Sequence, residues 1–172
     1  MGERGRLLNM LRKVSLVCAL ALVAACSPAK SESAPITPVA LAKAPHHAAS
    51  GLPVIPLSIT HNGKKHNFRV EVAASDADQE KGLMFRTAMG ADEGMIFPMN
   101  PPLLAAFWMK NTVMSLDIIY IGADHRVLNI AANAVPYSET ALYSEGRVSA
   151  VLELNAGRAA QLGIGKGDLV KW

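Results

Sequence analysis

Cysteine is scarce in this sequence: only two are present among 172 residues, Cys18 and Cys26, and both lie near the start. Residues 27–172 therefore contain no thiol. This absence excludes a disulfide, a cysteine-ligated zinc ion and a cysteine nucleophile from that part of the chain.

Excess positive charge is also absent from most of the chain. The formal net charge is +3, but residues 54–172 carry eleven Lys and Arg against twelve Asp and Glu, so the basic excess belongs to the first 53 residues. Aromatic residues make up only 5% of the sequence. No basic stripe with interleaved aromatics is found, and we therefore expect no nucleic-acid partner.

A long apolar run is missing at the N-terminus, where a shorter one is present. Basic residues precede an apolar run from Val14 to Leu22, which is too short to span a bilayer comfortably as a helix. This order is typical of a secretory signal peptide, here residues 1–25. An uncleaved membrane helix and the signal of a soluble secreted protein are the alternatives.

The residues before Cys26 make the signal more specific. Val23-Ala24-Ala25-Cys26 resembles the lipobox of bacterial lipoproteins. The resemblance implies that Cys26 is lipidated and becomes the first residue of the mature chain, which is then anchored to an envelope membrane and faces the periplasm. Ser27 resembles the residue that directs such proteins to the outer membrane rather than the inner one.

Two regions follow Cys26. Residues 26–53 are rich in Ala, Pro and Ser without a sustained period and predict a flexible tether. Residues 54–172 predict one mainly β domain with two short helices, an α+β class. We expect strands at 54–61, 66–73, 107–110, 116–121, 126–131, 150–154 and 169–172, helices at 76–81 and 156–162 with Asn155 as the cap of the second, and irregular structure over 83–106.

Five blocks of this domain together resemble a known family. They are GLMFR from Gly82, DEGMIF from Asp92, FWMKNT from Phe107, LDIIYI from Leu116, and AVLELNAGRAAQLGIGKGDLV from Ala150. In this order they are similar to the bacterial family called domain of unknown function 192, over about residues 54–172. The resemblance implies a compact β-rich domain, often exported, without an assigned reaction. The last block also resembles the helix-to-strand turn of cradle-loop barrels, which favours a small closed or partly closed β-barrel.

Two carboxylates lie in strongly apolar strands. Asp117 interrupts Leu116-Asp117-Ile118-Ile119-Tyr120-Ile121, a run whose two faces both carry apolar residues, and Glu153 stands between Leu152 and Leu154. A buried carboxylate costs several kcal/mol unless it is paired or hydrogen-bonded. We expect Asp117 to be held by Lys110, Arg86 or backbone N–H groups of the turn 111–115.

These residues predict one candidate site. A structural polar cluster that pins the strand connection is one interpretation. The other is a shallow pocket for a small polar or anionic ligand, such as a sugar or a peptide end, in a protein that is not an enzyme. Carboxylate-pair chemistry of a hydrolase or lyase through Asp117 and Glu153 is the alternative function. The predicted ligand-binding residues are Arg86, Trp108, Lys110, Asn111, Asp117 and Glu153.

Six methionines fall close together, between Met84 and Met114. Thioethers can bind Cu(I) in an exported protein. Methionine is also a flexible core filler, and no tight Met-x-x-Met array is present, so packing is the favoured interpretation. No cofactor and no metal ion are predicted.

Overall fold

The computed structural model describes residue 37 and residues 41–172. The predicted signal peptide and the predicted lipidation site Cys26 lie outside the described residues. Within the described part, no helix has the length and apolar character needed to cross a membrane.

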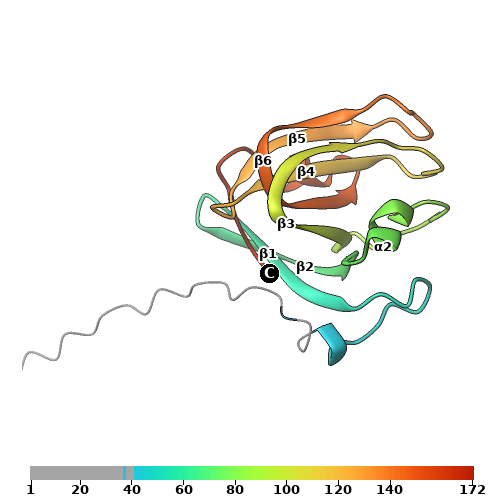
Figure 1. The fold of residues 1–172 in the computed structure, drawn as a ribbon. Coiled ribbons are helices and arrows are strands. Elements are labelled where there is room, and N and C mark those ends of the chain that lie inside the picture. The colour runs from blue at the N-terminus through green and yellow to red at the C-terminus, as the bar shows by residue number, and fades with distance from the viewer. Residues whose placement is uncertain (1–36, 38–40) are drawn as a thin grey trace, which may run out of the picture. The chain divides into compact units, whose positions relative to one another are not determined.

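Seven strands form one curled sheet in the order β5-β4-β6-β3-β2-β1-β7 (Figure 1). All neighbouring strands are antiparallel except β2 and β3, which are parallel. The strands are β1 Val54–His61, β2 Lys64–Val72, β3 Glu93–Phe107, β4 Leu116–Gly122, β5 Val127–Ala134, β6 Leu142–Asn155 and β7 Leu169–Lys171, and the helices are α2 Asp76–Lys81 and α3 Arg158–Leu162.

The two edge strands of the sheet approach each other where β5 begins. Arg126 and Leu169 form an isolated antiparallel bridge. Val127 N donates to Asp168 O at 3.0 Å, and Val170 N donates to His125 O at 2.8 Å. These bonds satisfy backbone groups that an open sheet would expose at both edges. The predicted mainly β fold with a partly closed barrel is therefore confirmed.

The first hairpin and the first helix agree with the sequence signals. Asn62 and Gly63 both have positive φ, 46° and 78°, as a two-residue hairpin turn requires. Helix α2 has the predicted bounds. Its cap is Ser75, whose side chain accepts from Asp78 N while the Asp78 carboxylate accepts from Ser75 N, a reciprocal capping box.

The expectation of irregular structure over 83–106 is wrong for strand β3. Its prolines, Pro98, Pro101 and Pro102, indicated a break because proline cannot donate to a ladder. The strand instead continues past them. It pairs with β2 only as far as Ile96, and its register with β6 shifts between Pro98 and Leu103. The prolines thus lie at a bend where the partner on one side has already ended.

Other boundaries also differ from the predictions. The strand expected at 107–110 ends at Phe107, and β6 begins at Leu142 rather than 150. Helix α3 is shorter than expected, and its N-cap is Gly157, with φ of 75°, instead of Asn155. Because the cap is a glycine, it has no side chain that could accept a hydrogen bond from the first turn of this helix.

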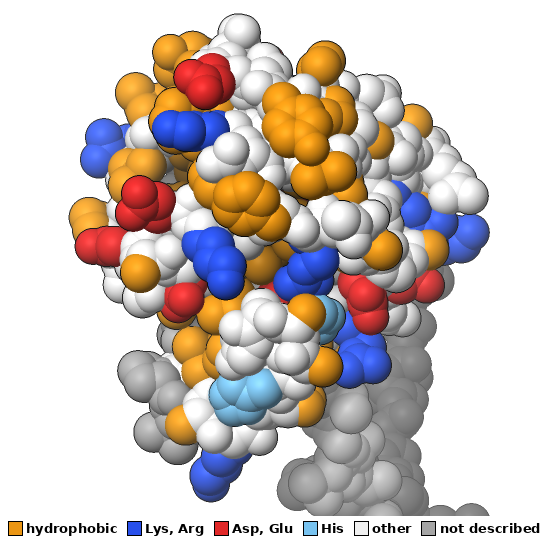
Figure 2. Space-filling view, turned by 90° about the vertical axis from the view of Figure 1, so that its right-hand side faces the viewer, with side chains coloured by type: hydrophobic (Ala, Val, Ile, Leu, Met, Phe, Trp, Pro, Cys, Tyr) orange, Lys and Arg blue, Asp and Glu red, His pale blue; other side chains and the backbone are white. Residues whose placement is uncertain are grey.

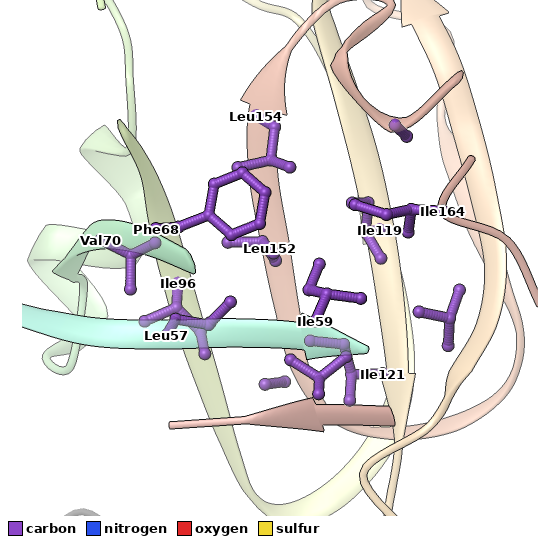
Figure 3. Packing of buried hydrophobic residues seen from close by; sticks show 14 of the residues in the cluster. Leu57, Ile59, Phe68, Val70, Ile96, Ile119, Ile121, Leu152, Leu154 and Ile164 are labelled. Atoms are coloured by element: carbon purple, nitrogen blue, oxygen red, sulfur yellow. The ribbon is translucent and has the colours of Figure 1, made fainter. Parts of the chain in front are cut away.

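The sheet carries one apolar core on each face. The interior core lies within the curl and combines side chains from β1, β2, β3, β4, β6 and β7, among them Leu57, Ile59, Ile119 and Leu152 (Figure 3). The outer core uses residues of β3, β4, β5 and β6 that point to the opposite face. It contains Met95, Phe97, Ile118, Tyr120 and Val151, and residues Leu83 and Met109 pack onto it from the connecting segments.

The segment before β1 is attached to the domain. Val54 N donates to Pro45 O at 2.7 Å, and Val72 N donates to Pro53 O at 2.9 Å. His46 and Pro53 form an isolated bridge. Leu41 also packs against the core of the domain, so described residues before Val54 are in contact with it.

Candidate functional site

Asp117 is fully buried, and backbone N–H groups hold its carboxylate. Oδ1 accepts from Asn133 N and from Gly157 N, each at 3.0 Å, and Oδ2 accepts from Ala159 N at 2.9 Å. Gly157 and Ala159 belong to the start of α3, whose cap lacks a side-chain acceptor of its own. Asp117 therefore caps this helix from β4 and ties it to the end of β5.

The prediction that Lys110, Arg86 or the turn 111–115 holds Asp117 is wrong. Its donors are backbone N–H groups, but they come from Asn133, Gly157 and Ala159 and not from the turn 111–115. Arg86 instead makes a bidentate ion pair with Glu71, with Nη–Oε distances of 2.9 and 3.0 Å.

Glu71 is a buried carboxylate that the sequence analysis missed. It is 4% exposed, and besides Arg86 it accepts a hydrogen bond from Ser50 Oγ. His47 Nδ1 lies 3.7 Å from its Oε1. Through Ser50 and His47, Glu71 thus fastens the segment that precedes β1 to β2. The signal was present, because Glu71 interrupts an apolar stretch of β2 between Val70 and Val72 much as Asp117 interrupts β4.

Trp108, Lys110 and Asn111 lie in the segment between β3 and β4. Trp108 is 48% exposed, and Lys110 Nζ stands 5.0 Å from the centre of its ring, a cation–π contact. Trp108 and Lys110 thus place an aromatic ring beside a cation, on a loop rather than on the strand expected at 107–110. Asn111, with φ of 54°, accepts from Phe85 N through its carbonyl at 2.9 Å and so joins this segment to the one that follows α2.

A pocket of about 410 Å³ opens on the outer face of the sheet, next to α2. We call it the α2 pocket. Gln79 holds α2 over the bend of β3, since its Nε2 donates to Pro98 O at 3.0 Å and to Ala73 O at 3.3 Å. Two of the predicted site residues, Trp108 and Glu153, line the pocket, together with Leu83, Phe97, Met99 and Phe107.

Glu153 is the buried ionisable group of this pocket. Its residue is 5% exposed, and no described residue gives its carboxyl group a hydrogen bond or an ion pair. Burial raises the pKa of Glu153 to about 8, so the isolated carboxyl group is mostly protonated at neutral pH. Burial, and then the charge of Glu153, raise the pKa of Tyr120, whose hydroxyl donates to Leu142 O at 2.7 Å.

Asp117 and Glu153 therefore have different environments. Asp117 does not line the α2 pocket, and three N–H groups already occupy its oxygens. The second carboxylate on the pocket is Glu80, which is exposed at its rim. The pocket thus does not bring together the pair of carboxylates on which the hydrolase alternative was based.

The methionines of this region pack in the manner expected of core fillers. Met95 and Met109 are 0% and 1% exposed within the outer core. Met84 and Met99 line the α2 pocket. Their flexible thioethers give the pocket an adaptable apolar wall.

The surroundings of the pocket are apolar at the surface as well. Leu103, Leu104 and Trp108 on its rim are 41%, 67% and 48% exposed. Figure 2 shows the side of the domain that lies at the right of Figure 1, where α2 is found. Hydrophobic side chains gather in the upper part of this face, and Lys, Arg, Asp and Glu side chains lie around them.

Comparison with known proteins places this geometry in a family. Residues 57–172 match the family DUF192, described as "Uncharacterized ACR". A crystal structure of a protein of unknown function from Novosphingobium aromaticivorans DSM 12444 is 54% identical, with a TM-score of 0.74, and the match covers 81% of this chain and all of that one. A structure from Sinorhizobium meliloti 1021, described as a proposed transcription regulator, is 37% identical, with a TM-score of 0.68, over 70% of this chain and 94% of that one. No curated protein matches the sequence.

The capping role of Asp117 predicts a graded loss of stability. Asp117→Leu leaves three buried N–H groups without an acceptor, at about 1–3 kcal/mol each when unsatisfied, so we expect a loss of at least about 3 kcal/mol. Asp117→Asn keeps one acceptor oxygen and should lose less, about 1–3 kcal/mol. Urea unfolding measures both, with the exposed Asp76→Asn as a control that should change little. Equal losses for Asn and Leu would contradict this role.

The raised pKa of Glu153 predicts a pH dependence of stability. The folded state holds this proton up to about pH 8, whereas the unfolded chain releases it near 4.5. The stability associated with the protonated group is therefore complete below about pH 4.5 and is lost as the pH rises through about 8. Glu153→Gln should remove this fall in unfolding free energy, and the exposed control Glu139→Gln should keep it. A Glu153→Gln protein with the wild-type pH slope would show that Glu153 ionises normally.

Proposed function

The chain belongs to the family of domain of unknown function 192, and from that premise we propose that it is a lipid-anchored envelope protein whose β-rich domain binds a small ligand in the α2 pocket. The ligand is bound and not chemically converted. The domain faces the periplasm from the membrane that holds the lipidated Cys26, with the outer membrane favoured over the inner one.

The observation that carries this proposal is the unpartnered Glu153 carboxyl group in an apolar pocket. A polar group in such a place costs free energy unless it forms a hydrogen bond. The Glu153 oxygens are not among the fully buried polar atoms without a partner, so they are accessible from the pocket, where a ligand could supply the hydrogen bond or charge that the described residues do not. The pocket volume of about 410 Å³ also lies in the range of small-molecule sites, roughly 300–1,000 Å³.

The shape of the pocket supports a ligand with an apolar body. Phe97 and Phe107 meet edge to face, with ring centres 5.0 Å apart, and both line the pocket. Trp108 offers a half-exposed ring at the rim. Aromatic walls contribute contact area at little cost in side-chain entropy, and one convergent polar group then fixes the orientation of the ligand.

The anchor rests on the sequence around Cys26. A lipidated Cys26 would be followed by the tether and then by the segment that Glu71 fastens to β2. Such an arrangement keeps the domain near the membrane while the α2 pocket stays open to the periplasm. Binding and tethering together describe a receptor or carrier of the envelope rather than an enzyme.

A thermal-shift screen against envelope sugars, peptides and other small molecules tests the binding proposal. A ligand that binds only the folded state raises the melting temperature. Ala106→Trp places a large side chain at an exposed position on the pocket wall and should abolish the shift, whereas Ala132→Trp, also exposed but outside the pocket, should keep it. A screen without a ligand that distinguishes these variants would refute the proposal.

Metabolic labelling tests the anchor. We expect a labelled fatty acid to enter the wild-type protein and to be absent from Cys26→Ala, because the thiol is the acylated group. The wild-type protein should then fractionate with the outer membrane and the variant should not. Equal labelling of the two proteins, or equal membrane retention, would overturn the lipoprotein assignment.

A further inference from the structure

The α2 pocket combines a buried acid with aromatic walls. Glu153 lines the pocket without a hydrogen bond or ion pair from any described residue, and Phe97, Phe107 and Trp108 line it as well. Aromatic faces carry negative charge density and attract cations. Trp108 already does so within this protein, because Lys110 Nζ stands 5.0 Å from its ring centre.

The remaining polar side chains of the pocket do not favour an anion. The amide nitrogen of Gln79 is engaged by the carbonyls of Ala73 and Pro98, and Thr112 Oγ1 donates to Lys110 O at 3.2 Å. Lys81 is exposed at the rim. An anion that entered the pocket would leave the solvated lysine behind and approach the carboxyl group of Glu153.

We infer that the α2 pocket binds an organic ammonium ion: a ligand whose apolar body lies against Phe97, Phe107 and Trp108 and whose positive nitrogen pairs with the Glu153 carboxylate. This inference rests on the proposed binding function and names its ligand class. It replaces the polar or anionic ligand expected from the sequence with a cation, because the structure places Arg86 in an ion pair with Glu71 and leaves Glu153 unpaired.

Pairing of the ammonium ion with Glu153 is coupled to the loss of the proton from the Glu153 carboxyl group. Burial raises the pKa of Glu153 to about 8, and a nearby positive charge lowers the pKa of a carboxyl group. Binding of an ammonium ion below pH 8 should therefore release the Glu153 proton to solvent. The other ionisable groups around the pocket are Tyr120 from β4, Glu80 and Lys81 from α2, and Lys110 beside Trp108.

Three probes that share one apolar body separate the charge classes: phenethylammonium, 2-phenylethanol and 3-phenylpropionate. Calorimetric titration of the whole purified protein at pH 8 should give an affinity for the ammonium ion at least tenfold above that for the alcohol, with the carboxylate weakest. At pH 7, titrations in two buffers of different ionisation enthalpy should show close to one proton released per ammonium ion bound.

Glu153→Gln should lower the ammonium affinity at least tenfold and remove the proton release, while the exposed variant Glu139→Gln should keep both. Equal affinities for ammonium and alcohol, a preference for the carboxylate, or an unchanged Glu153→Gln would overturn the inference. The proposed function would survive each of these results if other compounds still raised the melting temperature in wild type but not in Ala106→Trp. Loss of that pattern as well would mean that the binding function itself has failed.

Discussion

The pairing of β3 with β6 is the constraint on which the rest of the domain depends. These are the two longest strands, and both bend where their register shifts between Pro98 and Leu103. Before the bend they carry alternate residues into the interior core and the outer core. Beyond it, the same ladder carries Leu103, Leu104 and Phe107 along the wall of the α2 pocket. One pair of strands thus contributes to both the core and the candidate site.

Local signals were sufficient wherever the structure is determined by neighbouring residues. The hairpin turn at Asn62 and Gly63 needs only two residues that tolerate positive φ, and α2 needs only its cap and the acid three residues later. Strand β3 was missed because its prolines are tolerated through long-range pairing, namely the end of β2 beside them. No local pattern reports where a neighbouring strand ends.

The same limit applies to the candidate site. Burial of Asp117 and Glu153 could be predicted, because an acid between apolar residues of a strand has no exposed face to occupy. The groups that contact these two carboxyl groups in the fold could not be predicted. The donors of Asp117 are 16 to 42 residues away in sequence. Arg86, one of the expected partners, instead forms an ion pair with Glu71, a residue outside the predicted site. Trp108 and Glu153 meet at one pocket only because α2 and the bent β3 enclose it.

The two buried acids of the central strands show how burial alone leaves the role of a residue open. Three N–H donors compensate the buried carboxylate of Asp117, and it joins β4, β5 and α3. Glu153 lies on the neighbouring strand, β6, and no N–H donor compensates a negative charge on it. Its raised pKa keeps the carboxyl group protonated and therefore neutral at neutral pH. A protonated acid in an apolar pocket is responsive, because a cation, a base or a rise in pH can each change its charge. Among the described residues, buried atoms of His66, His125 and Arg158 also lack a hydrogen-bond partner. Of these groups, only Glu153 lines the α2 pocket, so it is the one that a ligand in that pocket would reach.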